Sequence, residues 1–333
     1  MSTAESAIRP AVGGELAARL RASPGVVAGA LVLIVVIAAF SLLRPEVFAT
    51  VDNLKVILNQ TAVAAILAAG VSVALVAGQY DLSVGAILGL TGVVAAVVVN
   101  TGAPWPVAGL AACGAGAVVG LANGAIVTGA RVPSIVTTLG TQTILLGVIS
   151  WATGDAYVRL ESPTMAEFAR GAALGVPNTA WVMVAICVVG ALLMRYTVAG
   201  RNIQAVGRSP DASRLAGISV VGYTLLALVV TGILAALAAV VLTAQLGSGH
   251  PEVSGGYLLP AFAAAFLGAA VSRTGTASFV GALYGALLLQ CVTNGLVVCN
   301  APSWSQWMVQ GAILVLAVAV SQAMRLRARR GRA

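Results

Sequence analysis

Ten runs of apolar residues between residues 26 and 323 leave this chain few folds that it can adopt. A transmembrane helix needs about 20 predominantly apolar residues, and its backbone polar groups must be satisfied within the segment itself. The runs lie near residues 26–43, 54–77, 82–99, 105–128, 134–153, 180–198, 220–246, 257–271, 276–299 and 304–323. We therefore predict an all-α, polytopic membrane protein with about ten transmembrane helices. The eighth run is short and contains Pro260, so we expect a broken or half-spanning helix there.

The composition excludes an ordinary soluble domain. Charged residues make up 8% of the 333 positions, whereas soluble proteins carry about 25%. The net charge of +8 could suggest binding to nucleic acid, but basic residues also gather on the cytoplasmic side of membrane proteins. We therefore expect the chain to sit in a lipid bilayer and to have no nucleic-acid partner.

The basic residues predict an orientation. With the N-terminus inside and ten alternating spans, 14 of the 18 basic residues fall on the inner side, because only Arg44, Lys55, Arg159 and Arg170 face outward. Both termini are then cytoplasmic. We divide the chain into an N-terminal tail (1–25), a membrane domain (26–323) and a basic tail (324–333).

One polar, arginine-bearing segment interrupts the apolar sequence at 200–218. Ser209 can cap a short helix, Pro210 suits its first position and Asp211 suits the positive end of its dipole, while Gly217 suits a left-handed stop. A short surface helix between two spans is a contact point for a partner protein. We take 199–219 as this interaction loop.

No catalytic or metal-binding group is apparent in the sequence. The four cysteines lie in or beside apolar runs without a CxxC pair, and His250 is the single histidine, so we expect no metal and no cofactor. A phosphate-binding loop needs a lysine after glycine, but Lys55, the only lysine, follows Leu54. We conclude that the chain is not an enzyme, and that any ATPase which drives it is a separate chain.

Polar residues inside apolar sequence are candidates for a solute path or for contacts between helices. Amides and hydroxyls suit a neutral polar solute, but they also join helices in membranes. The candidates for the path are Asn59, Gln60, Asn123, Thr141 and Asn294. Asp81 stands at the boundary between two runs, where it can cap the amides of Ser83 and Val84 or take a direct part in transport.

Four segments carry a family resemblance. They are GQYDLSVGAILGLTG (78–92), NGAIVTGARVPSIVTTLGTQTILLG (123–147), GRNIQAVGRSPDASRLAGI (200–218) and FLGAAVSRTGTASFVGALYGALLLQCVTNGL (266–296). They resemble the permease subunits of ribose-type ATP-binding-cassette importers, over about residues 50 to 322. The first is similar to the family signature GG-I-DLSVG, with Gly78, Asp81, Ser83 and Gly85 in matching places. Gln79 and Tyr80 depart from that signature, and Ala269–Val271 departs from a glycine-rich stretch near residue 270.

The resemblance implies a type II importer permease in a bacterial inner membrane. Two permease chains, identical or paralogous, would lie between an extracytoplasmic solute-binding protein and cytoplasmic ATPase subunits. The interaction loop would be the coupling helix that docks on the ATPase. Its contact residues would be Arg208, Ser209, Pro210, Asp211, Arg214, Leu215 and Ile218, with the leucine and isoleucine as apolar anchors. The solute would be a pentose, hexose, polyol or sugar-like signalling molecule.

Three other functions fit the sequence less well. An ion-gradient-driven secondary transporter of a small polar solute usually keeps charges within its spans, and this sequence has no mid-span charge. A membrane enzyme would need paired carboxylates, a histidine cluster or an activated nucleophile. A passive channel or scaffold would leave the segment 200–218 without a purpose.

Overall fold

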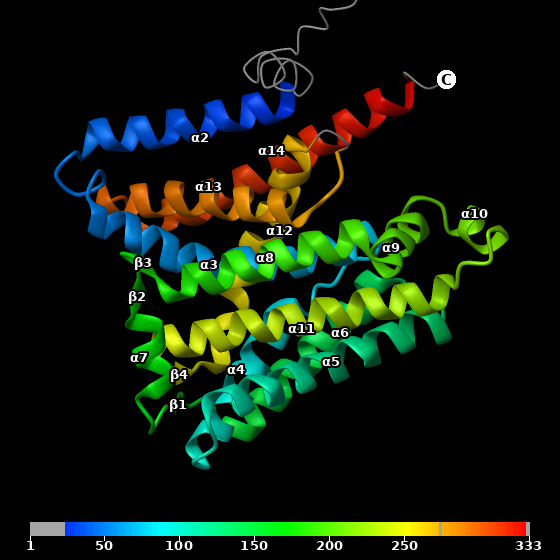
Figure 1. Ribbon diagram of the computed structural model, residues 1–333, viewed down its shortest axis with the longest axis horizontal. Coiled ribbons are helices and arrows are strands. Elements are labelled where there is room, and N and C mark those ends of the chain that lie inside the picture. Colours follow the sequence, from blue (N-terminus) through cyan, green and yellow to red (C-terminus); the bar gives the residue numbers. More distant parts are fainter. Residues whose placement is uncertain (1–23, 273–274, 331–333) are drawn as a thin grey trace, which may run out of the picture.

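The computed structural model describes residues 24–272 and 275–330. The predicted N-terminal tail, apart from Pro24 and Gly25, lies outside these residues, as do Arg273 and 331–333. Within the described ranges the chain is a bundle of long helices with four two-residue strands. Figure 1 shows most of the long helices running side by side, which agrees with the predicted all-α membrane fold.

Nine described helices are long and apolar enough to cross a membrane, and a shorter apolar helix, α4, brings the total to ten. These ten helices are α2 (Pro24–Leu43), α3 (Val51–Val76), α4 (Val84–Asn100), α5 (Trp105–Gly129), α6 (Ser134–Thr153), α8 (Asn178–Tyr196), α11 (Val220–Leu246), α12 (Ser254–Val271), α13 (Phe279–Val298) and α14 (Ser303–Arg330). The last of these extends through most of the predicted basic tail.

The short helix is not the one that the sequence predicted. Pro260 lies inside a continuous α12, which together with the 3-10 turn η1 (Pro251–Val253) gives an apolar stretch of 21 residues. The shortest crossing helix is instead α4, with 17 residues. Proline is tolerated in membrane helices where neighbouring helices satisfy the freed backbone groups.

Helix α3 forms the centre of the bundle. It packs against α8, α11, α12 and α13, and 78% of its apolar window is buried. Small residues allow close helix contacts in the same core: a Cβ at Gly116 would overlap the backbone of Gly232, and one at Gly268 would overlap that of Gly281. Close approach through small residues is how membrane helices gain packing energy without a hydrophobic driving force.

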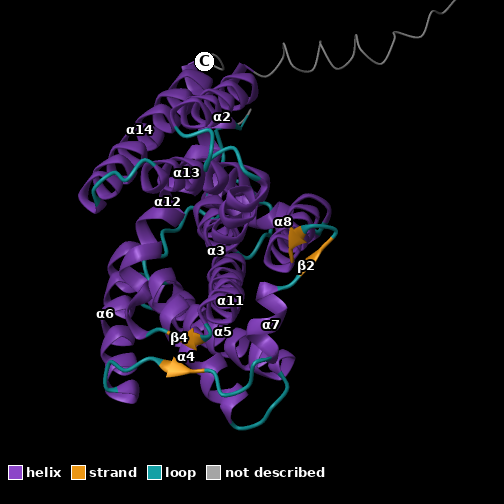
Figure 2. Ribbon diagram, turned by 90° about the vertical axis from the view of Figure 1, so that its left-hand side faces the viewer, coloured by secondary structure: helices purple, strands orange, loops and turns teal. Residues whose placement is uncertain are grey.

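The two ends of the bundle carry different structures. One end holds α7 (Thr164–Arg170) and two strand pairs, β1 (Val158–Arg159) with β4 (Ser248–Gly249) and β2 (Ala172–Ala173) with β3 (Val176–Pro177). The other end holds α9 (Val198–Arg208) and α10 (Pro210–Leu215). Figure 1 places these two groups at opposite sides of the view, and Figure 2 shows the strands from the side. We call them the α7 end and the α10 end.

Candidate coupling surface and signature turn

The predicted surface helix is present as α10. Ser209 Oγ accepts the amide of Ala212 at 3.4 Å, Pro210 is the first helical residue, and Gly217 has φ +76°. Arg214 Nη1 lies 2.9 Å from Asp211 Oδ1 in an exposed ion pair. The sequence therefore predicted the start, the stop and the exposure of this helix correctly.

The residues predicted to contact a partner lie together at this end of the molecule. The side chains of Arg208, Ser209, Pro210, Asp211 and Arg214 are exposed, and Ile218 is half-buried. Leu215 is 92% exposed, which leaves a large apolar side chain in the open. An isolated exposed leucine is ordinary, but one placed on a capped helix that projects from a bundle suits docking to a partner.

Helix α9 was not predicted, because its polar residues read as a loop. Thr197 caps it by accepting the amide of Gly200 at 3.1 Å, and Ile203 and Val206 are buried against the bundle. Gly207 packs so closely on the end of α3 that a Cβ there would overlap the carbonyl oxygen of Val76. The surface helix is therefore linked through α9 to the end of the central helix, and Gly207 is a point of close approach between the two.

The signature residues form a tight turn directly beyond that contact. Gly78 has φ +76°, a conformation that favours glycine, and it lies beside Gly207. Asp81 Oδ1 accepts the amide of Ser83 at 2.9 Å and its hydroxyl at 2.5 Å. The predicted bond to the amide of Val84 is not among the bonds of the described chain. Gly85 is the second residue of α4, where a Cβ would press on the carbonyl oxygen of Ser254.

Two residues predicted for the solute path also support this turn. Asn123 Nδ2, on α5, donates to Ser83 Oγ at 2.9 Å, and Thr141 Oγ1, on α6, donates to Asn123 Oδ1 at 2.6 Å. The carboxylate of Asp81 is thus the end of a hydrogen-bonded chain that runs through three further side chains. The other carboxylate oxygen is buried without a partner among the described residues.

Helix α6 also holds the backbone of the turn. Ser134 Oγ accepts the amide of Tyr80 at 3.1 Å, and Thr138 Oγ1 accepts that of Leu82 at 3.0 Å. Both residues lie in the segment 123–147, which resembles the family. Nothing in the local sequence predicts that residues of α6 bind a turn more than fifty positions earlier in the chain. We call residues 78–83 with these supporting side chains the signature turn.

Asn59 lies in a separate polar cluster nearer the α7 end. Its Oδ1 accepts Thr179 Oγ1 at 2.5 Å and Gln245 Nε2 at 2.8 Å, so it joins α3, α8 and α11. Gln60, the next residue, is exposed and bonds Gln290 of α13. The Oδ1 of Asn294, also on α13, is buried without a described partner. The five predicted path residues are therefore divided among three places.

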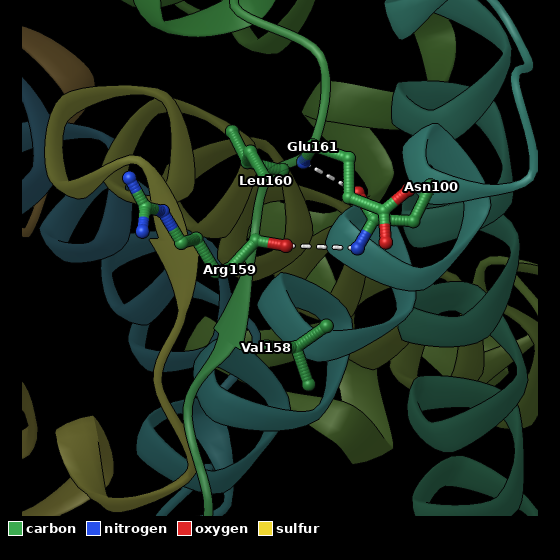
Figure 3. A pocket seen from close by; sticks show the side chains of 5 residues that line it. All are labelled: Asn100, Val158, Arg159, Leu160 and Glu161. Carbon is green, nitrogen blue, oxygen red and sulfur yellow. Dashed lines mark hydrogen bonds between the residues drawn. The ribbon is translucent and has the colours of Figure 1, made fainter.

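A shallow recess of about 620 Å³ lies at the α7 end. Figure 3 shows that it is lined by Asn100 at the end of α4 and by the segment Val158–Glu161. Asn100 Nδ2 donates to the carbonyl of Arg159 at 2.8 Å, and Asn100 Oδ1 accepts the amide of Glu161 at 3.0 Å. These bonds hold the connection 154–178, which joins α6 to α8, against the end of α4.

Comparison with known proteins agrees with this architecture. Residues 53–318 match the model of the family described as branched-chain amino acid transport system / permease component. The ribose import permease protein of Escherichia coli strain K12 is 37% identical over 292 residues, which cover 86% of this chain and 91% of that protein. The L-arabinose ABC transporter permease protein of Azospirillum brasilense is 30% identical, with 88% and 86% covered. The autoinducer 2 import system permease protein of Enterobacter sp. strain 638 is 31% identical, with 79% and 77% covered.

No solved structure matches this chain. The family match spans most of the sequence, and the curated relatives are permease subunits rather than enzymes. The ten apolar helices of the described residues agree with a polytopic, all-α permease. The chain belongs to the branched-chain amino acid transport system / permease component family, as a membrane-embedded transporter subunit.

Proposed function

We propose that this chain forms the translocation pathway for a sugar or sugar-like solute in an ATP-binding-cassette importer. The relatives named for ribose, L-arabinose, xylose and autoinducer 2 support this class of solute. The solute is delivered by an extracytoplasmic binding protein, and ATP is hydrolysed by a separate subunit. The chain itself supplies the membrane part of the importer.

The observation that carries this proposal is the exposed helix α10 at the end of a membrane-spanning bundle. Leu215, which is 92% exposed, is the apolar anchor that enters a groove of the ATPase, and Ile218 extends it. Arg208 and Arg214 flank the anchor with polar contacts. Because Gly207 rests on the end of α3, movement of α9–α10 is transmitted to the signature turn.

The opposite, α7 end is where the binding protein docks. It presents the recess beside Asn100 and the paired strands that tie the connection 154–178 to the segment 247–253. Charges of both signs lie exposed in this connection, including Arg159, Glu161 and Glu167. A mixed, polar and firmly held surface suits a reversible protein contact.

The α10 end and both termini face the cytoplasm in this proposal. All five tryptophans lie within five residues of a helix end at the α7 end, where they suit a membrane–water boundary. A second permease chain, identical or paralogous, completes the pathway. The broad exposed face of α6, of which only 22% of the apolar window is buried, supports such an additional contact.

Gentle extraction of the tagged chain from its native membrane tests the proposal. We expect an ATPase subunit to co-purify, and we expect the complex in liposomes, supplied with binding protein and internal ATP, to take up a labelled pentose. Cross-linking of the purified complex would give the number of permease chains. Recovery of the chain alone, with uptake that follows a proton or sodium gradient, would contradict the proposal.

A further inference from the structure

A row of polar side chains crosses the surface of the bundle from α3 to α14. Gln290 Nε2 donates to Gln60 Oε1, and Gln310 Nε2 donates to Thr293 Oγ1 at 3.5 Å. Residues 290, 293 and 294 share one face of α13, because positions three and four apart are neighbours on a helix. We call Gln60, Gln290, Thr293, Asn294 and Gln310 the amide cluster.

The amide cluster lies at the depth of the hydrocarbon layer. Gln60 is nine residues into α3 and Gln290 is eight residues from the end of α13, so both lie about 12–14 Å from the α7 ends of their helices. Gln310 is seven residues into α14, about 10 Å from the same side. Three helices therefore bring amides to one level.

Lipid is an unsuitable neighbour for this surface. Gln60 is exposed, and its bond with Gln290 uses only its carbonyl oxygen, so the two amide hydrogens of Gln60 have no partner among the described residues. Polar groups left without hydrogen bonds in hydrocarbon are costly. Water, solute or another chain must therefore satisfy this face of α3 and α13.

Asn294 gives an independent sign of a ligand. It is only 7% exposed, and its Oδ1 has no hydrogen-bond partner among the described residues. It is one residue from Thr293 and four from Gln290, so it lies on the face that carries the amide cluster. A buried acceptor beside exposed donors is the arrangement that a hydroxyl group can satisfy, by donating one bond and accepting another.

We propose that the amide cluster is a solute-binding station within the pathway, which hydrogen-bonds a neutral, polyhydroxylated solute as it crosses. No charged side chain belongs to it, which fits a neutral solute. The amides of Gln60 and Gln290 contact adjacent hydroxyls, and Asn294 accepts a further hydroxyl. This inference rests on the proposed import function and assigns the residues that contact the solute.

Uptake by the complete importer in liposomes tests the station, with labelled D-ribose and L-arabinose as probes. We expect Gln60→Leu and Gln290→Leu each to lower the maximal uptake rate about tenfold, with basal ATP hydrolysis retained. The half-saturating concentration stays near the wild-type value, because the binding protein captures the sugar first. The double variant should be no worse than either single variant, because the two amides act as a pair.

Thr128→Val is the matched control. Thr128 is a half-buried polar residue of the spanning helix α5, and its hydroxyl bonds the carbonyl of Gly124 in its own helix at 2.7 Å. Wild-type uptake in both glutamine variants would overturn the station. If the wild-type complex took up neither sugar and bound no ATPase, the import function itself would fail, which is a distinct outcome.

Thiol accessibility tests the surface without depending on uptake. We expect a water-soluble, membrane-impermeant thiol reagent to label Gln60→Cys above the wild-type background. We expect added D-ribose or L-arabinose to protect this cysteine from the reagent. Val35→Cys is the control at similar depth, since Val35 is 63% exposed on α2, eight residues before its end. Absence of labelling at Gln60→Cys in an assembled, ATP-hydrolysing complex would show a dry face and overturn the proposal.

Discussion

At the scale of single residues, Asp81 shows how far local sequence can predict a role. Its position before an apolar run predicted a cap, and the structure gives it two bonds from Ser83. The continuation through Asn123 and Thr141 could not be predicted, because those residues come from other helices and either role was open to a polar side chain in lipid. The packing of α5 and α6 against the turn is what brings these side chains together.

Substitution of Asp81 separates support of the turn from direct transport. Asp81→Asn keeps an oxygen that accepts both bonds from Ser83, so we expect normal assembly and most of the uptake. Asp81→Leu removes that acceptor, and we expect about 2–3 kcal/mol of destabilisation. Thermal unfolding in detergent and sugar uptake measure the two effects. Near-complete loss of uptake in a normally expressed Asp81→Asn variant would give the carboxylate a direct role in transport.

At the scale of elements, helices with strong end signals were predicted well, whereas α9 was not. Helix α10 has a capping serine, a first-position proline and a terminal glycine. Helix α9 has an amphipathic face with buried Ile203 and Val206, but its polar residues suggested a loop. The length of the eighth apolar run also led to a wrong prediction. The turn η1 extends α12 to a full span, and the short helix is α4.

The contact between α9 and α3 is a prediction at this scale. Gly207→Val places a side chain against the carbonyl of Val76, and overpacking of this kind costs about 1–3 kcal/mol. We expect α9 to shift from the end of α3 and uptake to fall at least tenfold. Gly114→Val is the control, because a Cβ at Gly114 meets nothing within 4 Å. Equal uptake in the two variants would mean that the glycine contact carries no coupling.

Docking through α10 is tested by replacing its apolar anchor. We expect Leu215→Asp to insert normally into the membrane but to uncouple ATP hydrolysis from transport, because a charged side chain cannot enter an apolar groove. Val280→Asp is the control, since Val280 is 68% exposed in the first turn of α13 and belongs to neither α9 nor α10. ATPase co-purification and uptake are measured together. Full uptake by Leu215→Asp would remove the coupling role from α10.

At the scale of the whole molecule, the fold class could be predicted because membranes restrict the choices, and the family could be predicted from the four segments that resemble it. Long apolar runs permit only spanning helices, and few charges disturb that pattern. The roles of the polar residues were harder to predict. The amide of Asn59 joins neighbouring helices, whereas the amide of Gln60, the next residue, is exposed. Adjacent positions in sequence serve different neighbours, and only the assembled bundle separates them.

Orientation belongs to the whole molecule, and two cysteine variants test it. Ala156 and Ala216 are both exposed, the first in the connection at the α7 end and the second at the end of α10. Because basic residues gather at the α10 end and tryptophans at the α7 end, we expect an impermeant maleimide to label Ala156→Cys in intact spheroplasts. Ala216→Cys should react only after permeabilisation, with the wild-type chain giving the background of its four native cysteines. Both termini then lie inside, because ten crossings return the chain to its starting side. The reverse labelling pattern would show the opposite orientation in the membrane, in which no cytoplasmic ATPase could reach α10.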